Sequence, residues 1–102
     1  MNFKSVTFVR IYLTEGSHLQ KEIFNYLKNE AKLPGVSIFR AIGGFGSTGT
    51  HSTSLVDLSL DLPLVIEFFD DKEKIEPTLN HLSSLLKPGH IVFWEGQVLL
   101  GG

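Results

Sequence analysis

The sequence contains no cysteine, so disulfide bonds and zinc sites with thiolate ligands are excluded. It also lacks a basic block, and its formal net charge is −2, so nucleic-acid binding through charge alone is not expected. No apolar run approaches the roughly 18 residues of a membrane-spanning helix. Residues 1–10 lack the continuous apolar core and cleavage site of a signal peptide, so we expect a cytoplasmic protein.

The chain has the length and composition of one globular domain. Its 102 residues are 42% hydrophobic and 20% charged, which is typical of a folded domain and argues against disorder. A chain of this length is too short for two domains. We therefore expect a single domain over residues 1–102.

Alternating or continuous apolar residues predict four strands. They are residues 6–13, 36–42, 62–69 and 90–94. Pro63 stands at the start of the third strand, where its missing N–H is tolerated. We expect Gly96 to bend the last strand before residues 97–100. Residues 54–61 alternate only partly and predict either a short strand or an irregular return arm.

Apolar residues at helical spacing predict two helices, one after each of the first and third strands. The spacing is carried by Leu19, Ile23, Leu27 and Ala31 in the first helix and by Ile75, Leu79, Leu82 and Leu86 in the second. Each therefore presents one apolar face to a core.

The predicted helix ends follow from the flanking residues. Ser17 and Gln20 match a capping box, and Gly35 is expected to take the left-handed turn after the first helix. The pair Asp70-Asp71 supplies an N-cap for the second helix, in which Pro77 predicts a kink or a late start. The Lys87-Pro88-Gly89 turn ends that helix.

The predicted order is β-α-β, loop, β-α-β. Two such units give an α+β fold, the ferredoxin-like βαββαβ sandwich, with two helices on one face of an antiparallel sheet. Phenylalanine, valine, tyrosine and tryptophan side chains then fall on the opposite face. So large an uncovered apolar surface usually marks an interface, and self-association is the simplest way to cover it.

A glycine- and hydroxyl-rich stretch at residues 40–54 is the candidate functional segment. Residues 44–49 are a literal G-x-G-x-x-G, but they follow the second strand and not the first, and the chain is too short for a dinucleotide-binding fold. Two interpretations stay open. The backbone N–H groups form a nest for phosphate or carboxylate, or the segment is a hairpin loop without a ligand.

Few side chains suggest chemistry, and none forms a recognisable catalytic pair. Arg40 suits either a phosphate clamp or a salt bridge at the sheet edge. His51 could bind phosphate, ligate a metal, act as an acid or base, or be solvated. Glu67 is either solvated or a polar anchor in a cleft. The other histidines are too dispersed in the sequence to predict a metal site.

Three segments together resemble a known family. They are Arg-Ala-Ile-Gly-Gly-Phe-Gly at 40–46, Thr-His-Ser at 50–52 and Ser-Leu-Asp-Leu-Pro-Leu-Val-Ile-Glu at 59–67. This combination resembles the domain-of-unknown-function 190 proteins, which are similar to the PII signalling proteins. The resemblance implies a ferredoxin-like trimer whose loop after the second strand corresponds to the PII T-loop.

The resemblance also implies an adenine nucleotide (AMP, ADP or ATP), bound in clefts between subunits at the base of that loop. The ligand-binding residues that it suggests are Arg40, Gly43, Gly44, Phe45, Gly46, His51, Glu67, Lys87 and Gly89. The leading hypothesis is a trimeric regulator that signals to a target protein such as a transporter or an enzyme. The alternatives are a small enzyme with His51 as acid/base, and a structural oligomer without a ligand.

Overall fold

The structure is a computed structural model that describes residues 1–14, 18–43 and 63–101. The Ser17 capping box, the loop after Gly43 and the return arm at 54–61 lie outside these residues. The described elements are β1 (Asn2–Thr14), α1 (His18–Asn25), the π-helical turn η1 (Tyr26–Glu30), β2 (Ser37–Arg40), β3 (Pro63–Asp70), α3 (Lys72–Ser83) and β4 (Ile91–Gly101).

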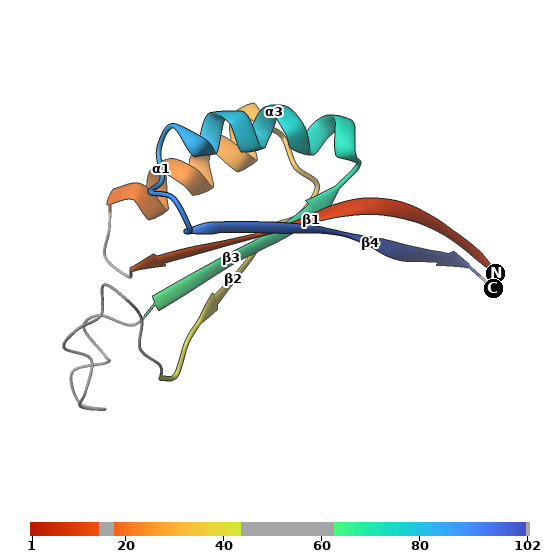
Figure 1. Ribbon diagram of the computed structural model, residues 1–102, viewed down its shortest axis with the longest axis horizontal. Helices are drawn as coiled ribbons and strands as arrows, with labels where there is room; N and C mark the ends of the chain where they lie inside the picture. The colour runs from red at the N-terminus through yellow and green to blue at the C-terminus, as the bar shows by residue number, and fades with distance from the viewer. Residues whose placement is uncertain (15–17, 44–62, 102) are drawn as a thin grey trace.

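The strands form one antiparallel sheet in the order β2-β3-β1-β4. Both helices lie on the same face of this sheet (Figure 1). This arrangement confirms the predicted ferredoxin-like sandwich. Pro63 begins β3 as expected, at a place where a missing donor costs little. No helix in the described part of the chain is long and apolar enough to cross a membrane.

The core lies between the helices and one face of β1 and β3. Alternate residues of β1, among them Val9 and Ile11, are fully buried there. Ile66 of β3 pairs with Ile11 and is equally buried. Ile23 of α1 and Ile75 of α3 close the core from the helical side. The apolar faces predicted for the two helices therefore pack against alternate residues of β1 in one core.

The opposite face of the sheet carries exposed large side chains, as the sequence predicted. These are Tyr12, Phe39, Phe69, Val92 and Trp94, which come from all four strands. At its centre the ring of Phe8 stacks on Trp94, with centroids 5.5 Å apart. It also packs at a tilt against Phe69, with centroids 4.9 Å apart. We refer to this surface as the open face.

The bend expected at Gly96 was wrong. Strand β4 runs without interruption from Ile91 to Gly101, and Gly96 pairs with Val6 in an unshifted register. A glycine at this position leaves room for the side chain of Phe8 and does not form a turn. A Cβ atom at Gly96 would lie 2.6 Å from Cε2 of Phe8.

Two expectations about helix ends were also wrong. The left-handed residue after η1 is Lys32, with φ 54°, and not Gly35; the N–H of Leu33 then donates to the Leu27 carbonyl. Helix α3 does not start late, because it begins at Lys72 after Asp71 and includes Pro77. Of the predicted pair Asp70-Asp71, Asp71 occupies the N-cap position, although its side chain makes no capping hydrogen bond. The kink at Pro77 stays a prediction.

Candidate functional site

Most of the predicted site residues that the structure describes lie at one end of the sheet. Strand β2 ends at Arg40, which pairs with Leu64 near the start of β3. The turn that precedes β4 lies at the same end, beside the end of β1 (Figure 1). Arg40 and Gly43 are therefore at the same end of the molecule as Lys87 and Gly89.

These two groups nevertheless lie on opposite edges of the sheet. Strands β2 and β4 are the outer strands, and β3 and β1 stand between them. Three spacings between neighbouring strands amount to about 14 Å. Within one subunit the structure therefore does not bring the end of β2 together with the turn before β4. The remaining predicted residues of the loop, Gly44, Phe45, Gly46 and His51, lie outside the described part of the chain.

The turn before β4 is anchored to β1. The N–H of His90 donates to the Lys87 carbonyl at 3.2 Å, and Gly89 has a left-handed φ of 88°. The His90 carbonyl accepts a hydrogen bond from the Tyr12 N–H at 2.9 Å. The imidazole Nδ1 of His90 lies 3.1 Å from the Tyr12 carbonyl oxygen. These hydrogen bonds hold the backbone of this exposed turn against β1. Among the described residues no cluster of three potential metal ligands is present.

Glu67 lies elsewhere, on the open face in the middle of β3. Its Oε2 accepts hydrogen bonds from both Nε (3.0 Å) and Nη2 of Arg10, which pairs with it across the strands. The hydrogen bond to Glu67, followed by that to Tyr12, raises the pKa of Arg10. The guanidinium carbon of Arg10 stands 5.6 Å from the centroid of the Trp94 ring. Glu67 therefore forms an ion pair among the apolar side chains of the open face, and its role as a polar anchor in a cleft stays a prediction.

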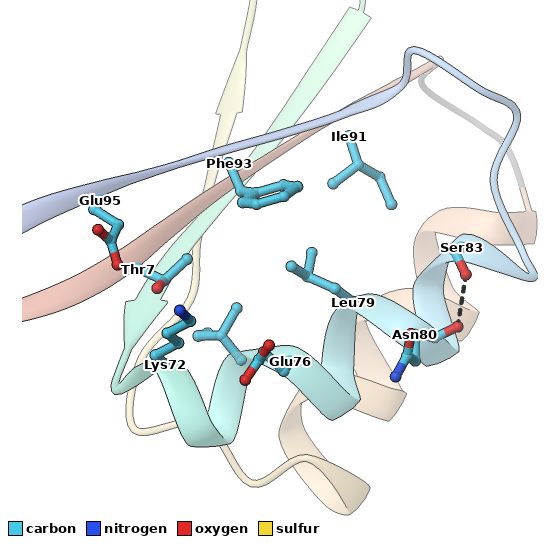
Figure 2. A pocket seen from close by; sticks show the side chains of 10 residues that line it. Thr7, Lys72, Glu76, Leu79, Asn80, Ser83, Ile91, Phe93 and Glu95 are labelled. Carbon is cyan, nitrogen blue, oxygen red and sulfur yellow. Dashed lines mark hydrogen bonds between the residues drawn. The ribbon is translucent and has the colours of Figure 1, made fainter.

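A groove that the sequence analysis missed lies between α3 and β4. Helix α3 packs over β1 and β3, and the helix-side face of β4 stays open beside it. The groove has a volume of about 590 Å³. Its lining residues are Thr7, Lys72, Ile75, Glu76, Leu79, Asn80, Ser83, Ile91, Phe93 and Glu95. Figure 2 shows the side chains of Ile91 and Phe93 directed across the groove toward Leu79.

The fold of the chain resembles that of PII-like proteins. It superposes on CPII of Thiomonas intermedia K12 bound to ADP and bicarbonate with a TM-score of 0.65 and 21% identity, covering 95% of this chain and 89% of that one. A putative PII-like signaling protein of Thermus thermophilus gives a TM-score of 0.62 and 21% identity over 96% of this chain and 91% of that one. The PII-like fold inferred from the sequence is confirmed.

The sequence defines the family within this class. The chain belongs to the DUF190 family, described as an uncharacterized ACR, whose pattern matches residues 6–98. A UPF0166 protein of Methanocaldococcus jannaschii is 31% identical over 99 residues, with 91% of both chains covered. A UPF0166 protein of Aquifex aeolicus is 35% identical over 79 residues, which cover 72% of this chain and 75% of the relative. The predicted family resemblance is confirmed.

Proposed function

We propose that this chain forms a trimeric PII-like regulatory protein that binds an adenine nucleotide in clefts between its subunits, beside the glycine-rich loop. The observation that carries the proposal is the placement of Arg40 and Gly43 on one edge of the sheet and of Lys87 and Gly89 on the other, at the same end. A cleft between two copies brings the β2 edge of one copy next to the β4 edge of another.

The chemistry of the two edges suits a phosphorylated ligand. The guanidinium of Arg40 matches the geometry of a phosphate, and Lys87 adds a second positive charge. Glycine at position 89 allows a left-handed turn whose backbone N–H groups can approach an anion. CPII of Thiomonas intermedia K12, which shares the fold, has been crystallised with ADP and AMP. This supports adenine nucleotides as the first ligands to test.

The open face supplies the reason for self-association. Its exposed aromatic residues, Phe39, Phe69 and Trp94 among them, come from all four strands and surround the Arg10–Glu67 ion pair. Burial of this surface against other copies stabilises an oligomer by about 25 cal/mol for each Å² of apolar area.

Regulation requires that the nucleotide bind two states of the loop with different affinities, because only such a difference shifts their populations. The target is a protein such as a transporter or an enzyme.

Calorimetric titration of the purified chain with ADP, ATP and AMP, with and without bicarbonate, tests this proposal. We expect saturable binding of at least one nucleotide, without its consumption, by a species that light scattering identifies as a trimer. No binding of any of the three would overturn the nucleotide assignment. A monomer at micromolar concentration would contradict the shared cleft. Turnover of the nucleotide would favour the enzyme alternative.

A further inference from the structure

The sheet extends at one end into a two-stranded arm. Strand β3 stops pairing with β1 at Thr7, opposite Asp70, whereas β4 continues to pair with β1 as far as Asn2 and Gly101. Residues 2–6 and 96–101 therefore form a ribbon of two strands, which we call the arm. Figure 1 shows the arm projecting from the end of the sheet opposite to the turn before β4.

The arm exposes large apolar side chains. Phe3 and Leu99 pair across the two strands and are 56% and 63% exposed. Because side chains alternate along a strand, both lie on the helix side of the sheet, the side of Thr7 and Glu95. A two-stranded ribbon is only marginally stable by itself in water. An arm with this composition is expected to be covered by another surface.

The groove between α3 and β4 matches this face of the arm in chemistry and length. Its floor is apolar, and Phe93 at its centre is 60% exposed. Along α3 it extends from Lys72 to Ser83, a distance of about 17 Å at 1.5 Å for each residue. The five residues of the arm in β1 span about 13 Å, which fits within this length.

The arm cannot occupy the groove of its own subunit. Thr7 and Glu95 line the end of the groove nearest the arm. From there both strands continue outward without a change of register up to Phe3. The occupant of the groove must therefore come from another molecule, and a second copy of this chain carries a segment of the right length and polarity.

We infer that the arm of one copy docks in the α3–β4 groove of the next copy, with Phe3 and Leu99 against Phe93 and Leu79. Such a contact joins two different surfaces and closes into a ring when the rotation between copies permits it. The exposed parts of Phe3 and Leu99 and their groove partners amount to roughly 400 Å², well below the roughly 1,600 Å² of a standard interface. The open face provides the remainder. This inference rests on the proposed self-association and assigns the surfaces responsible for it.

The first test removes the apolar side chains of the arm. We expect Leu99→Ser, alone or with Phe3→Ser, to raise the dissociation constant of the oligomer at least tenfold in sedimentation equilibrium. An unchanged dissociation constant in the double variant would overturn the assignment of the docking face.

The second test asks whether the arm and the groove are partners. Phe93→Glu should impair the groove; if circular dichroism shows that it does not fold, Phe93→Ser replaces it. A chain with a defective groove still has an intact arm, and a chain with both Phe3→Ser and Leu99→Ser still has an intact groove. We expect a mixture of the two variants to form a heterodimer, while each variant alone associates weakly.

The outcomes separate this inference from the proposed function. A monomeric parent chain would contradict both. A trimer that survives the arm and groove substitutions would overturn only the arm docking, because the open face would then account for assembly alone. Failure of the mixture to associate more tightly than either variant would show that the arm and the groove are not partners, which would also overturn the inference.

Discussion

The ring of Phe8 covers the backbone of β4 at Gly96, where a Cβ atom would lie 2.6 Å from Cε2 of the ring. This ring cannot simply move aside. It is stacked on Trp94, with an angle of 6° between the two planes, and it contacts Phe69 on its other neighbouring strand. The glycine therefore provides space for an aromatic cluster on the open face, and it does so within a regular strand.

Gly96→Ala should destabilise the protein. The added methyl group must displace the Phe8 ring or the strand, and overpacking of this kind costs about 1–3 kcal/mol of the free energy of unfolding. Gly101→Ala is the control, since no atom lies within 4 Å of a Cβ at that position. Urea unfolding at one protein concentration measures both variants. An unchanged midpoint for Gly96→Ala would contradict a fixed position of the ring.

A double-mutant cycle on Arg10 and Glu67 should show strong coupling. Both bonds from the guanidinium reach one oxygen of Glu67, amid the apolar side chains of the open face. Removal of either partner leaves a charge without its counterion, whereas removal of both leaves none. Arg10→Met and Glu67→Met should therefore each weaken the oligomer more than the double substitution does. If the free-energy changes of dissociation, measured by sedimentation equilibrium, add for the two substitutions, this role is contradicted.

The periodic features of the sequence predicted the fold well. In β1 the alternation over residues 6–13 predicted a strand, and Val9, Ile11 and Leu13 form its buried face. The i+4 spacing of Ile23 and Leu27 identified the buried side of the first helix. Such patterns are reliable because burial of one face is repeated over many residues, so that no single contact decides it.

Features that depend on a single tertiary contact were not predictable in this way. Gly96 suggests a bend in the sequence, and only the ring of Phe8 above it explains a glycine within an uninterrupted strand. The left-handed conformation of Lys32 accompanies a hydrogen bond from the Leu33 N–H to the carbonyl of Leu27 in the π-helical turn η1. Local preference favoured Gly35 because glycine accepts this conformation at the lowest cost.

The candidate site was predictable only as a set of segments. The glycine-rich motif and the family resemblance indicated Arg40 and the turn at Gly89, but the order of the strands was needed to place them on opposite edges. The groove was missed because its walls come from distant segments. Its sequence signal was the alternation of Ile91, Phe93 and Glu95, from which the sequence predicted only a strand over residues 90–94.

Substitution of Gly89 should lower the stability of the protein, although no atom lies within 4 Å of a Cβ at this position. Its φ of 88° is unfavourable for a residue with a Cβ atom, so Gly89→Ala should lower the free energy of unfolding by about 1–2 kcal/mol. Gly35→Ala is the matched control, because Gly35 also has no neighbour within 4 Å but lacks a positive φ. That variant should be neutral or slightly stabilising. Equal unfolding midpoints for the two variants would contradict a strained turn.

The ion pair between Lys4 and Asp71 should be visible in a titration. The two charged atoms are 2.9 Å apart, and the hydrogen bond to Asp71 raises the pKa of Lys4 above its ordinary value of 10.5. A raised pKa in the folded state gives a stabilising contribution that is complete below pH 10.5 and is lost as the pH rises through the folded-state value. Asp71→Asn keeps a favourable N-cap residue and removes the charge. NMR titration of the Lys4 side chain should give a lower midpoint in this variant; an unchanged midpoint would show that the pair does not persist in solution.

The last prediction concerns the proposed nucleotide site at the end of β2. If Arg40 contacts a phosphate directly, Arg40→Ala should weaken binding on the order of 1.5–3 kcal/mol, about 10- to 150-fold. Arg40→Lys should lose part of this affinity, since lysine keeps the charge but not the planar fork. Gly46→Val should abolish binding, because a β-branched residue obstructs close approach of the backbone to a phosphate. His51→Ala should have a smaller effect than Arg40→Ala.

Lys21→Ala, on the exposed side of α1, is the charge-matched control and should bind like the parent. Each variant is titrated calorimetrically with ADP, ATP and AMP, and its oligomeric state is measured in parallel by light scattering. Parent-like binding by both Arg40→Ala and Gly46→Val would place the ligand elsewhere. Loss of the oligomer together with binding would show instead that the base of the loop holds the subunits together, since affinity at a shared cleft cannot survive dissociation of the subunits that form it.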